Sequence, residues 1–386
     1  MNLIKEAIDV FIEGEEWNKA KRVAKELEPR YEDYVDQKYK EHLKNQGKVD
    51  SLVGVDVMAA LDMYADRGQW EKCLETASKQ NFKILQKYVA LYATQLIKEE
   101  EAPKALQLYV QHGAPPNPQN FNIYKRLFLD LINFPDTDGP ESYRMWADLR
   151  NFLLQLCENM SRSAEANSPA HENFEQMLLI AHYYATRSAS KGVVQLVSLP
   201  AKLSVSLLRH TELVPADKAF YEAGLACRAV GWENMAFIFL NHCLDLCDAF
   251  DEGTLEALDH SDFLDTDIPF EVPVPTKLCV TDAQREQIRD WVLMVSMDNR
   301  LEQVLPRDER NSYEASLVAA NTGLRSLPCV LTDKIEFSSA GNVANKKDWN
   351  SFLLATKSTY SPECQDVLKF ISKWCGGLPA SGFSFH

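Results

Sequence analysis

The sequence predicts a mainly α-helical protein, in which a solenoid of stacked helix pairs is followed by a small α+β module. The first observation is that residues 60–77 contain two short helical patterns in succession. The second pattern places apolar residues at Trp70, Cys73, Leu74 and Ala77, the spacing of a helix with one buried face. The second observation is that this arrangement returns elsewhere in the chain. Because one short helix pair cannot bury its apolar face alone, we expect neighbouring pairs to stack.

The repeated pattern is clearest at residues 7–24 and 60–77, where an alanine, an aromatic residue and a tryptophan keep the same spacing: Ala7, Phe11 and Trp17, then Ala60, Tyr64 and Trp70. Asp9 in the first copy matches Asp62 in the second. A shorter third copy, at residues 223–239, is centred on Trp232. We therefore interpret Trp17, Trp70 and Trp232 as structural residues that pack between neighbouring helix pairs.

The composition excludes several classes of protein. The chain has 386 residues, a net charge of −15 and a pI near 5.1, which argue against a nucleic-acid groove lined by lysine and arginine. No apolar run approaches the length of a membrane span, and the acidic N-terminus is not typical of a signal peptide. The pattern begins within a repeat and lacks a polar cap, so we expect a fragment or isoform of a longer repeat protein.

Composition and helical periodicity predict five consecutive regions. Residues 1–112 are expected to form three helix pairs, and residues 113–247 longer, less regular pairs that continue the solenoid. Residues 248–280 are acidic and proline-rich, which indicates a linker or strap. We expect residues 281–324 to form connecting helices and residues 325–386 to form a separate module. Within the second region we expect helices near 121–132, 141–160, 172–189, 193–209, 216–229 and 232–247.

The C-terminal regions have their own predicted elements. A helix is expected from the Thr281 cap to residue 304. In the module, a β-rich piece at residues 330–337 is expected to return near Val343, followed by helices at 347–357 and 363–374.

The common enzyme motifs for phosphate binding, dinucleotide binding, zinc proteolysis and serine hydrolysis are missing from the sequence, and we predict no cofactor. His242, Cys243 and Cys247 form the densest Cys/His cluster. A metal pair or a nucleophile is one interpretation of that cluster, but its apolar neighbours favour ordinary core. The nine cysteines are odd in number and mostly lie on apolar helix faces, which is typical of reduced thiols.

Two further metal hypotheses remain open on the sequence alone. Asp265, Asp267 and Glu271 could bind calcium, although the EF-hand spacing is absent and a solvated linker is the simpler interpretation. A zinc site could form from residues that lack the usual closely spaced knuckle: Cys329, Cys364, Cys375 and His386.

The order of loops and helices in the module resembles the U-box, a RING-like domain that uses packing and hydrogen bonds in place of zinc. The two loops are at residues 327–330 and 360–364. The resemblance implies a shallow groove for a ubiquitin-conjugating enzyme or ubiquitin, formed by Leu327, Val330, Phe352 and Pro362. It also implies weak ubiquitin-ligase activity, with structural roles for Cys329, Trp349 and Cys364. The usual Asp-Pro after the first loop is replaced by residues 331–334, and the alternative is that Leu327, Val330 and Phe352 are simply core.

The chain as a whole resembles the C-terminal part of the family of the 172-kDa subunit of the intraflagellar transport B complex. The resemblance is carried by the repeats, the acidic strap and the ending from Cys329 through Trp349, Pro362 and Trp374 to the terminal SGFSFH. It implies a tetratricopeptide-like solenoid that ends in a U-box-like module. It further implies a scaffold that binds other transport subunits at the cilium, the ciliary base and in the cytoplasm.

Overall fold

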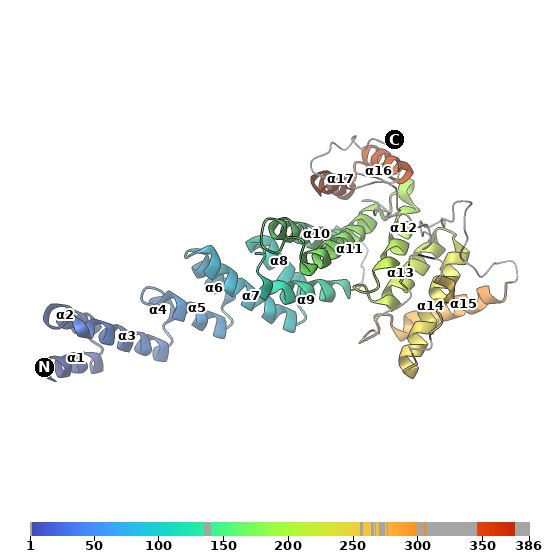
Figure 1. Cartoon of the computed structure of the whole chain (residues 1–386). Coiled ribbons are helices and arrows are strands. Elements are labelled where there is room, and N and C mark those ends of the chain that lie inside the picture. Colours follow the sequence, from blue (N-terminus) through green and yellow to red (C-terminus); the bar gives the residue numbers. More distant parts are fainter. Residues whose placement is uncertain are drawn as a thin grey trace. The chain divides into compact units, whose positions relative to one another are not determined.

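The computed structural model of the chain is built mainly of helices (Figure 1). It describes residues 2–134, 140–254, 258–263, 266, 268–269, 275, 277–298, 305 and 346–374. The described residues contain no β-strand, and none of their helices is long and apolar enough to cross a membrane. The helical part of the predicted fold class is therefore confirmed. The β-rich piece predicted at residues 330–343 lies outside the described residues, so the structure shows neither a β component nor a U-box-like domain.

The chain divides into two units, Met1–Glu99 and Glu100–His386. The first unit contains α1 (Asn2–Glu13), α2 (Trp17–Leu27), α3 (Glu32–Gln46), α4 (Val49–Leu52), α5 (Val57–Asp66), α6 (Trp70–Ser78) and α7 (Phe82–Lys98). Each helix contacts the next one along the chain, as expected for a solenoid. The predicted pairs α1–α2 and α5–α6 are present. The three pairs predicted for residues 1–112 were too few, because α3 and α4 were not recognised.

The repeated residues of the first unit make the same polar contact twice. Tyr34 donates a hydrogen bond from its hydroxyl to Asp9 at 2.8 Å, and Tyr88 donates one to Asp62 at 2.6 Å. The aspartate lies on the first helix of a pair and the tyrosine on the helix that follows the pair. The bond to Asp9 raises the pKa of Tyr34, which keeps the hydroxyl protonated as a donor. This bond connects one pair to the next in both copies.

The tryptophans of the two copies also have matching aromatic partners. The Trp70 ring stacks on Tyr92 at a centroid distance of 4.7 Å, and its Nε1 donates a hydrogen bond to Gln95 at 3.1 Å. Trp17 lies 5.0 Å from the Tyr39 ring and is only half-buried. Both positions are consistent with the predicted packing between pairs, whereas Trp232 is half-buried just before α14.

We expect Trp70→Phe to lower the free energy of unfolding by about 1 kcal/mol, because the phenyl ring keeps the stack but cannot donate to Gln95. The matched variant Trp17→Phe should cost less, since the Trp17 ring is more exposed. Urea unfolding of the full chain measures both. Equal losses in the two variants would contradict the role of the Gln95 bond.

The second unit continues with longer helices: α8 (Ala102–His112), α9 (Phe121–Ile132), α10 (Pro140–Ser161), α11 (Pro169–Ser190), α12 (Leu199–Ser206), α13 (Ala216–Ala229), α14 (Glu233–Glu252), α15 (Asp282–Ser296), α16 (Lys346–Thr359) and α17 (Pro362–Trp374). The bounds of α9 and α13 agree with the sequence prediction. α12 is shorter than predicted because single turns of 3-10 helix, Val194–Leu196 and Leu207–His210, flank it. α14 extends to Glu252, where Gly253 takes a left-handed conformation and ends the helix.

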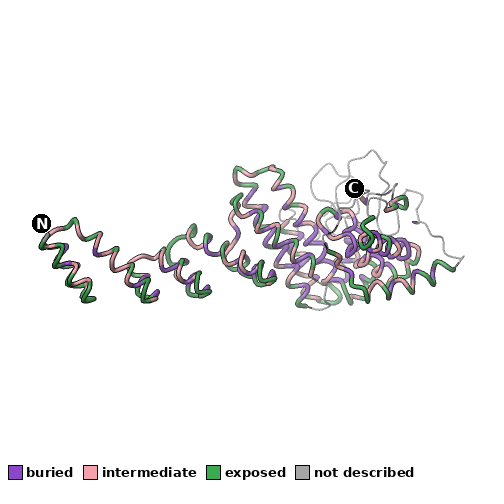
Figure 2. The backbone as a smooth tube through the Cα atoms, turned by 90° about the horizontal axis from the view of Figure 1, so that it is seen from below, coloured by how far each residue is buried: buried purple, intermediate pink, exposed green. Residues whose placement is uncertain are grey.

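The core of the second unit lies along α10 and α11, each of which has 22 residues. Figure 2 shows buried residues concentrated along the helices of this unit. Trp146 of α10 stacks on Tyr184 of α11 at a centroid distance of 4.4 Å, and both side chains are buried. These two helices therefore provide the surface on which later elements pack.

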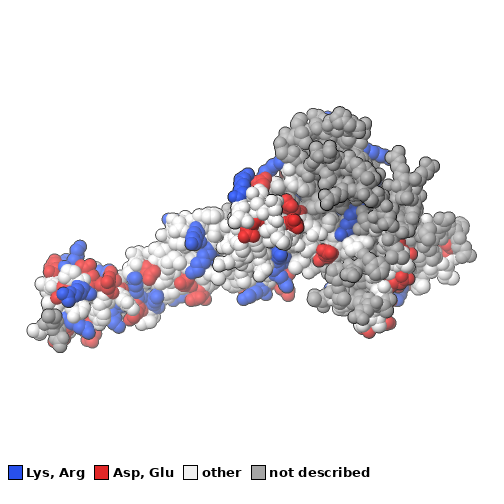
Figure 3. Space-filling model, in the orientation of Figure 1, with Lys and Arg blue, Asp and Glu red and all other residues white. Residues whose placement is uncertain are grey.

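Charged residues of both signs are interspersed on the N-terminal helices, on the face drawn in Figure 3. Among the charged residues of the first unit, Lys21 pairs with Asp36 at 2.6 Å and Lys40 with Asp56 at 3.4 Å. Exposed pairs of this kind contribute little to stability.

Candidate protein-interaction site

The structure places four of the seven residues to which the U-box resemblance assigns a role. Leu327, Val330 and Cys329 lie outside the described residues. On α16, Phe352 and Trp349 are buried, with exposed fractions of 0% and 2%. On α17, Cys364 is also buried, whereas Pro362 is exposed at the first position.

The described helices of the predicted module pack on the second unit. α17 contacts α10 and α11, and α16 contacts both α17 and the short helix Val194–Leu196. The Cys364 thiol donates to the carbonyl oxygen of Ala189 at 3.3 Å, and burial raises its pKa. This thiol is therefore buried and protonated, which does not favour a nucleophile, and its structural role stays a prediction. The ubiquitin-binding groove stays a prediction, since half of its residues are not described.

One buried cation anchors α17. Arg150 of α10 has a fully buried side chain, and its Nη2 donates to Asp366 of α17 at 2.8 Å. Tyr143 donates its hydroxyl to the same carboxylate oxygen at 2.6 Å, and burial is the first cause of its raised pKa. The Arg150 guanidinium also lies 4.0 Å from the centroid of the Phe370 ring. Charge, hydrogen bonding and ring packing thus converge on one face of α17.

A second ion pair holds α16. Lys202 of α12 donates to Asp348 at 2.5 Å, and both side chains are largely buried. His182 of α11 stacks on Phe370 at a centroid distance of 5.2 Å and lies 5.4 Å from Trp374. Together the two pairs and the aromatic cluster hold the terminal helices on this unit, because the buried Arg150 guanidinium and the largely buried Lys202 ammonium find their carboxylate partners there.

An open groove of about 510 Å³ lies beside this docking site, between α10 and α11. Its apolar lining includes Leu154, Leu178, Leu179 and Trp374. Glu158 and Glu175 contribute carboxylates to the same lining. This feature was not predicted from the sequence, because it forms where three helices meet. We refer to it below as the α10–α11 groove.

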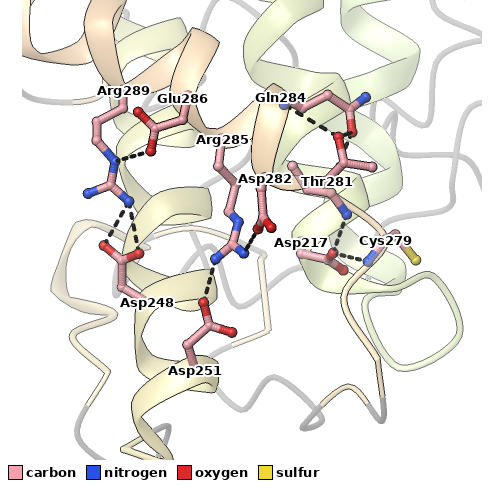
Figure 4. Close-up of polar contacts among 11 residues, drawn as sticks. Asp217, Asp248, Asp251, Cys279, Thr281, Asp282, Gln284, Arg285, Glu286 and Arg289 are labelled. Atoms are coloured by element: carbon pink, nitrogen blue, oxygen red, sulfur yellow. Dashed lines mark hydrogen bonds and ion pairs between the residues drawn. The ribbon is translucent and has the colours of Figure 1, made fainter.

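The end of the acidic strap is fastened to α13 by backbone donors (Figure 4). The Asp217 carboxylate accepts hydrogen bonds from the backbone N–H groups of Cys279 at 2.5 Å and Val280 at 2.9 Å. Thr281 then begins α15 with a reciprocal capping box formed with Gln284. The predicted cap is therefore confirmed, although α15 ends at Ser296 and residues 299–304 are not described.

Two arginines of α15 pair with acids of α14 (Figure 4). Arg285 pairs with Asp251 at 2.6 Å, and Arg289 pairs with Asp248 at 3.0 Å. These acids belong to the run that was interpreted as a solvated strap. At least two of its carboxylates therefore orient α15 on α14, although both are half exposed and contribute modestly.

The His242, Cys243 and Cys247 cluster lies in an aromatic core. His242 is 4.5 Å from the Phe220 ring and 4.9 Å from the Phe263 ring, measured between centroids. The Cys243 thiol donates to the carbonyl oxygen of Asp217 at 3.4 Å. Burial is the first cause that lowers the pKa of His242 to about 3, with His260 adding to it. The buried imidazole is therefore neutral at pH 7, which fits the interpretation of this cluster as ordinary core.

We expect His242 to make the chain less stable in mild acid. Because the pKa is lowered on folding, the unfolded chain takes up a proton as the pH falls below the ordinary value of 6.5, and the folded chain does not. The free energy of unfolding should then fall by up to about 1.4 kcal/mol per pH unit. In His242→Leu, the contribution of this histidine to the pH dependence of the free energy of unfolding should disappear.

Urea unfolding between pH 7 and pH 4.5 measures this effect, and Phe263→Leu is the control. That variant disturbs the same cluster without removing a titratable group, so its pH slope should match the original chain. An unchanged slope in His242→Leu would contradict the assignment of a buried neutral imidazole.

Metal binding finds no support among the residues that the structure describes, where no group of three or more metal-ligand side chains converges. Asp265, Asp267 and Glu271, as well as Cys329, Cys375 and His386, lie outside those residues. Cys73, Cys157, Cys227, Cys243 and Cys247 are buried with free thiols, as predicted. The packing role of these cysteines needs no cofactor.

No family model matches the chain, but curated proteins match along its whole length. It is 73% identical over 392 residues to the Intraflagellar transport protein 172 homolog of Danio rerio, and 70% identical to the human homolog. These alignments cover 100% of the chain. Intraflagellar transport protein 172 of Chlamydomonas reinhardtii is 30% identical over 90% of it. The chain belongs to the intraflagellar transport protein 172 family.

The chain spans about a fifth of the length of these intraflagellar transport protein 172 relatives, 22% of the vertebrate ones and 21% of the Chlamydomonas one. The vertebrate likeness covers both structural units and the terminal helices. The resemblance inferred from the repeats and the ending is therefore confirmed at the level of the family.

Proposed function

We propose that the chain is a scaffold segment of intraflagellar transport trains, which binds other transport subunits or adaptors while cilia are assembled and maintained. One observation carries the proposal: the whole chain is 73% identical to a relative whose name places it in intraflagellar transport. The helical architecture supports it, since stacked helices present long surfaces that suit large-area protein contacts. We expect the chain to act in the cilium, at the ciliary base and in the cytoplasm.

A segment exchange tests this proposal in cells. The chain replaces the matching segment of the zebrafish relative, and the hybrid is expressed in cells that lack that relative. We expect cilia to be restored to the length seen with the unaltered relative, whereas deletion of the segment should fail to restore them. Normal cilia after the deletion would overturn the proposal, because the segment would then be dispensable.

A binding experiment tests the scaffold mechanism separately. The purified full chain is presented to purified intraflagellar transport subunits, one at a time, at micromolar concentration. We expect at least one stable association. Absence of binding to every subunit would remove the main support for a scaffold, even if the segment exchange succeeds.

A further inference from the structure

The α10–α11 groove is formed by three helices of the second unit. The last two turns of α10 contribute Leu154, Cys157 and Glu158, and the first half of α11 contributes Glu175 and Leu179. Trp374, the last residue of α17, also lines the space. The docking of α17 by Arg150 and Asp366 therefore helps to shape the groove. Its volume of about 510 Å³ lies within the range of ligand-binding pockets in proteins.

The lining combines an apolar surface with two carboxylates. Leu154, Leu179 and Trp374 offer the apolar contacts, whereas Glu158 and Glu175 are partly or largely exposed. The negative charge reaches the buried Cys157 thiol: burial is the first cause that raises its pKa, to about 12 in all, and the carboxylates of Glu175 and Glu158 contribute to the rise. Both carboxylates therefore act on the same small region.

Each carboxylate keeps the capacity to bind a partner. Glu158 is 4.0 Å from Lys373, and Glu175 is 3.7 Å from His171. Both separations are longer than a hydrogen bond, so each carboxylate has oxygen atoms that can accept from a closer donor. An apolar surface between two such acids complements a segment with the opposite charge and a large apolar side chain. Lysine and arginine suit it well, because their stems cover apolar surface while their charged ends reach the acids.

We propose that the α10–α11 groove docks a short basic segment of a partner protein, in which a large apolar side chain is flanked by lysine or arginine. The proposal deepens the scaffold function by naming the chemistry of one partner, and it rests on that function. The chain's own residues 375–386 are a rival occupant because they follow Trp374, but they include no lysine or arginine. Charge complementarity therefore favours the partner.

Selection from a library of random short peptides, displayed on phage and presented to the purified full chain, tests the proposal. We expect the enriched peptides to share a large apolar residue next to lysine or arginine. Enrichment of peptides without a basic residue, or no enrichment at all, would overturn it. This assay uses no transport subunit and no cilium, so its failure is distinguishable from failure of the scaffold function.

Variants of the chain then locate the binding site. One enriched peptide is synthesised, and its affinity for each variant is measured by fluorescence anisotropy. The double variant Glu158→Gln and Glu175→Gln keeps the shape of the groove and should weaken binding by at least about tenfold. The control, Glu172→Gln, alters an exposed acid of α11 outside the groove lining and should bind like the original chain. Equal affinities in all three proteins would refute the assignment.

A competition experiment addresses the rival occupant. A synthetic peptide with the sequence of residues 375–386 is added in excess to the complex. We expect it to leave the bound basic peptide in place. Displacement would overturn the proposal in favour of the chain's own terminal residues.

Discussion

Phe352→Ala is expected to destabilise the docked terminal helices by about 3 kcal/mol, because the phenyl ring has no exposed surface and its removal leaves a cavity. Hydrogen exchange of peptides that cover α16 and α17 measures this loss where it occurs. Urea unfolding of the full chain reports whether the rest of the second unit is affected. Protection equal to that of the original chain would contradict the burial of Phe352.

Pro362→Ala is the matched variant, since both residues were assigned to the same hypothetical ubiquitin-conjugating groove. Pro362 is exposed at the first position of α17, where a missing N–H costs the helix little. Its replacement should change the free energy of unfolding by less than about 0.5 kcal/mol.

Comparing the variants Phe352→Ala and Pro362→Ala also allows a test of ubiquitin transfer to be interpreted. A slower discharge of ubiquitin from a conjugating enzyme in Phe352→Ala alone would report lost folding. Pro362→Ala, in which we expect the fold to be retained, tests the groove itself. Equal discharge rates with the original chain and with Pro362→Ala would remove the predicted role of Pro362.

Asp366→Ala is expected to cost about 2 kcal/mol, because it leaves the fully buried Arg150 guanidinium without its carboxylate. The estimate is below the cost of breaking a fully buried pair, since the Asp366 side chain is 47% exposed and water screens it. The Tyr143 hydroxyl also loses its acceptor. Hydrogen exchange over α17 should therefore show the main loss of protection.

The double variant Arg150→Met and Asp366→Ala distinguishes charge from packing. Removing both charges leaves no uncompensated cation, so we expect the double variant to recover much of the stability that Asp366→Ala loses. Lys373→Ala is the control, because the Lys373 side chain is 65% exposed and only approaches Glu158 at 4.0 Å. The single variant Arg150→Met completes the comparison. If the double variant loses as much free energy of unfolding as the two single variants together, Arg150 acts through the Phe370 ring instead.

Helical periodicity alone predicted much of the local structure. The apolar stripe beginning at Trp70 marked α6, and the predicted helices at residues 121–132 and 216–229 agree with α9 and α13. The helices predicted at 347–357 and 363–374 agree with α16 and α17 within a few residues. In contrast, α3 was missed, because its sequence EDYVDQKYKEHLKNQ has a weak apolar face.

The partners of the buried faces could not be predicted. An amphipathic stripe shows that a helix has a buried face, but many apolar surfaces can cover it. The contact of Asp366 with Tyr143 spans 223 residues of sequence, and no local pattern records it. The same is true of the α10–α11 groove, which combines residues of α10 and α11 with Trp374.

The sequence by itself therefore determined the helical class, the repeated Trp-centred pairs and the family, since these depend on local spacing and on residue identity. Only the tertiary structure decided that the terminal helices dock on α10–α12, that Phe352 is core and Pro362 is surface, and that Glu158 and Glu175 face one groove. The physical reason is that burial and charge pairing depend on which surfaces meet in space, and those surfaces come from distant parts of the chain.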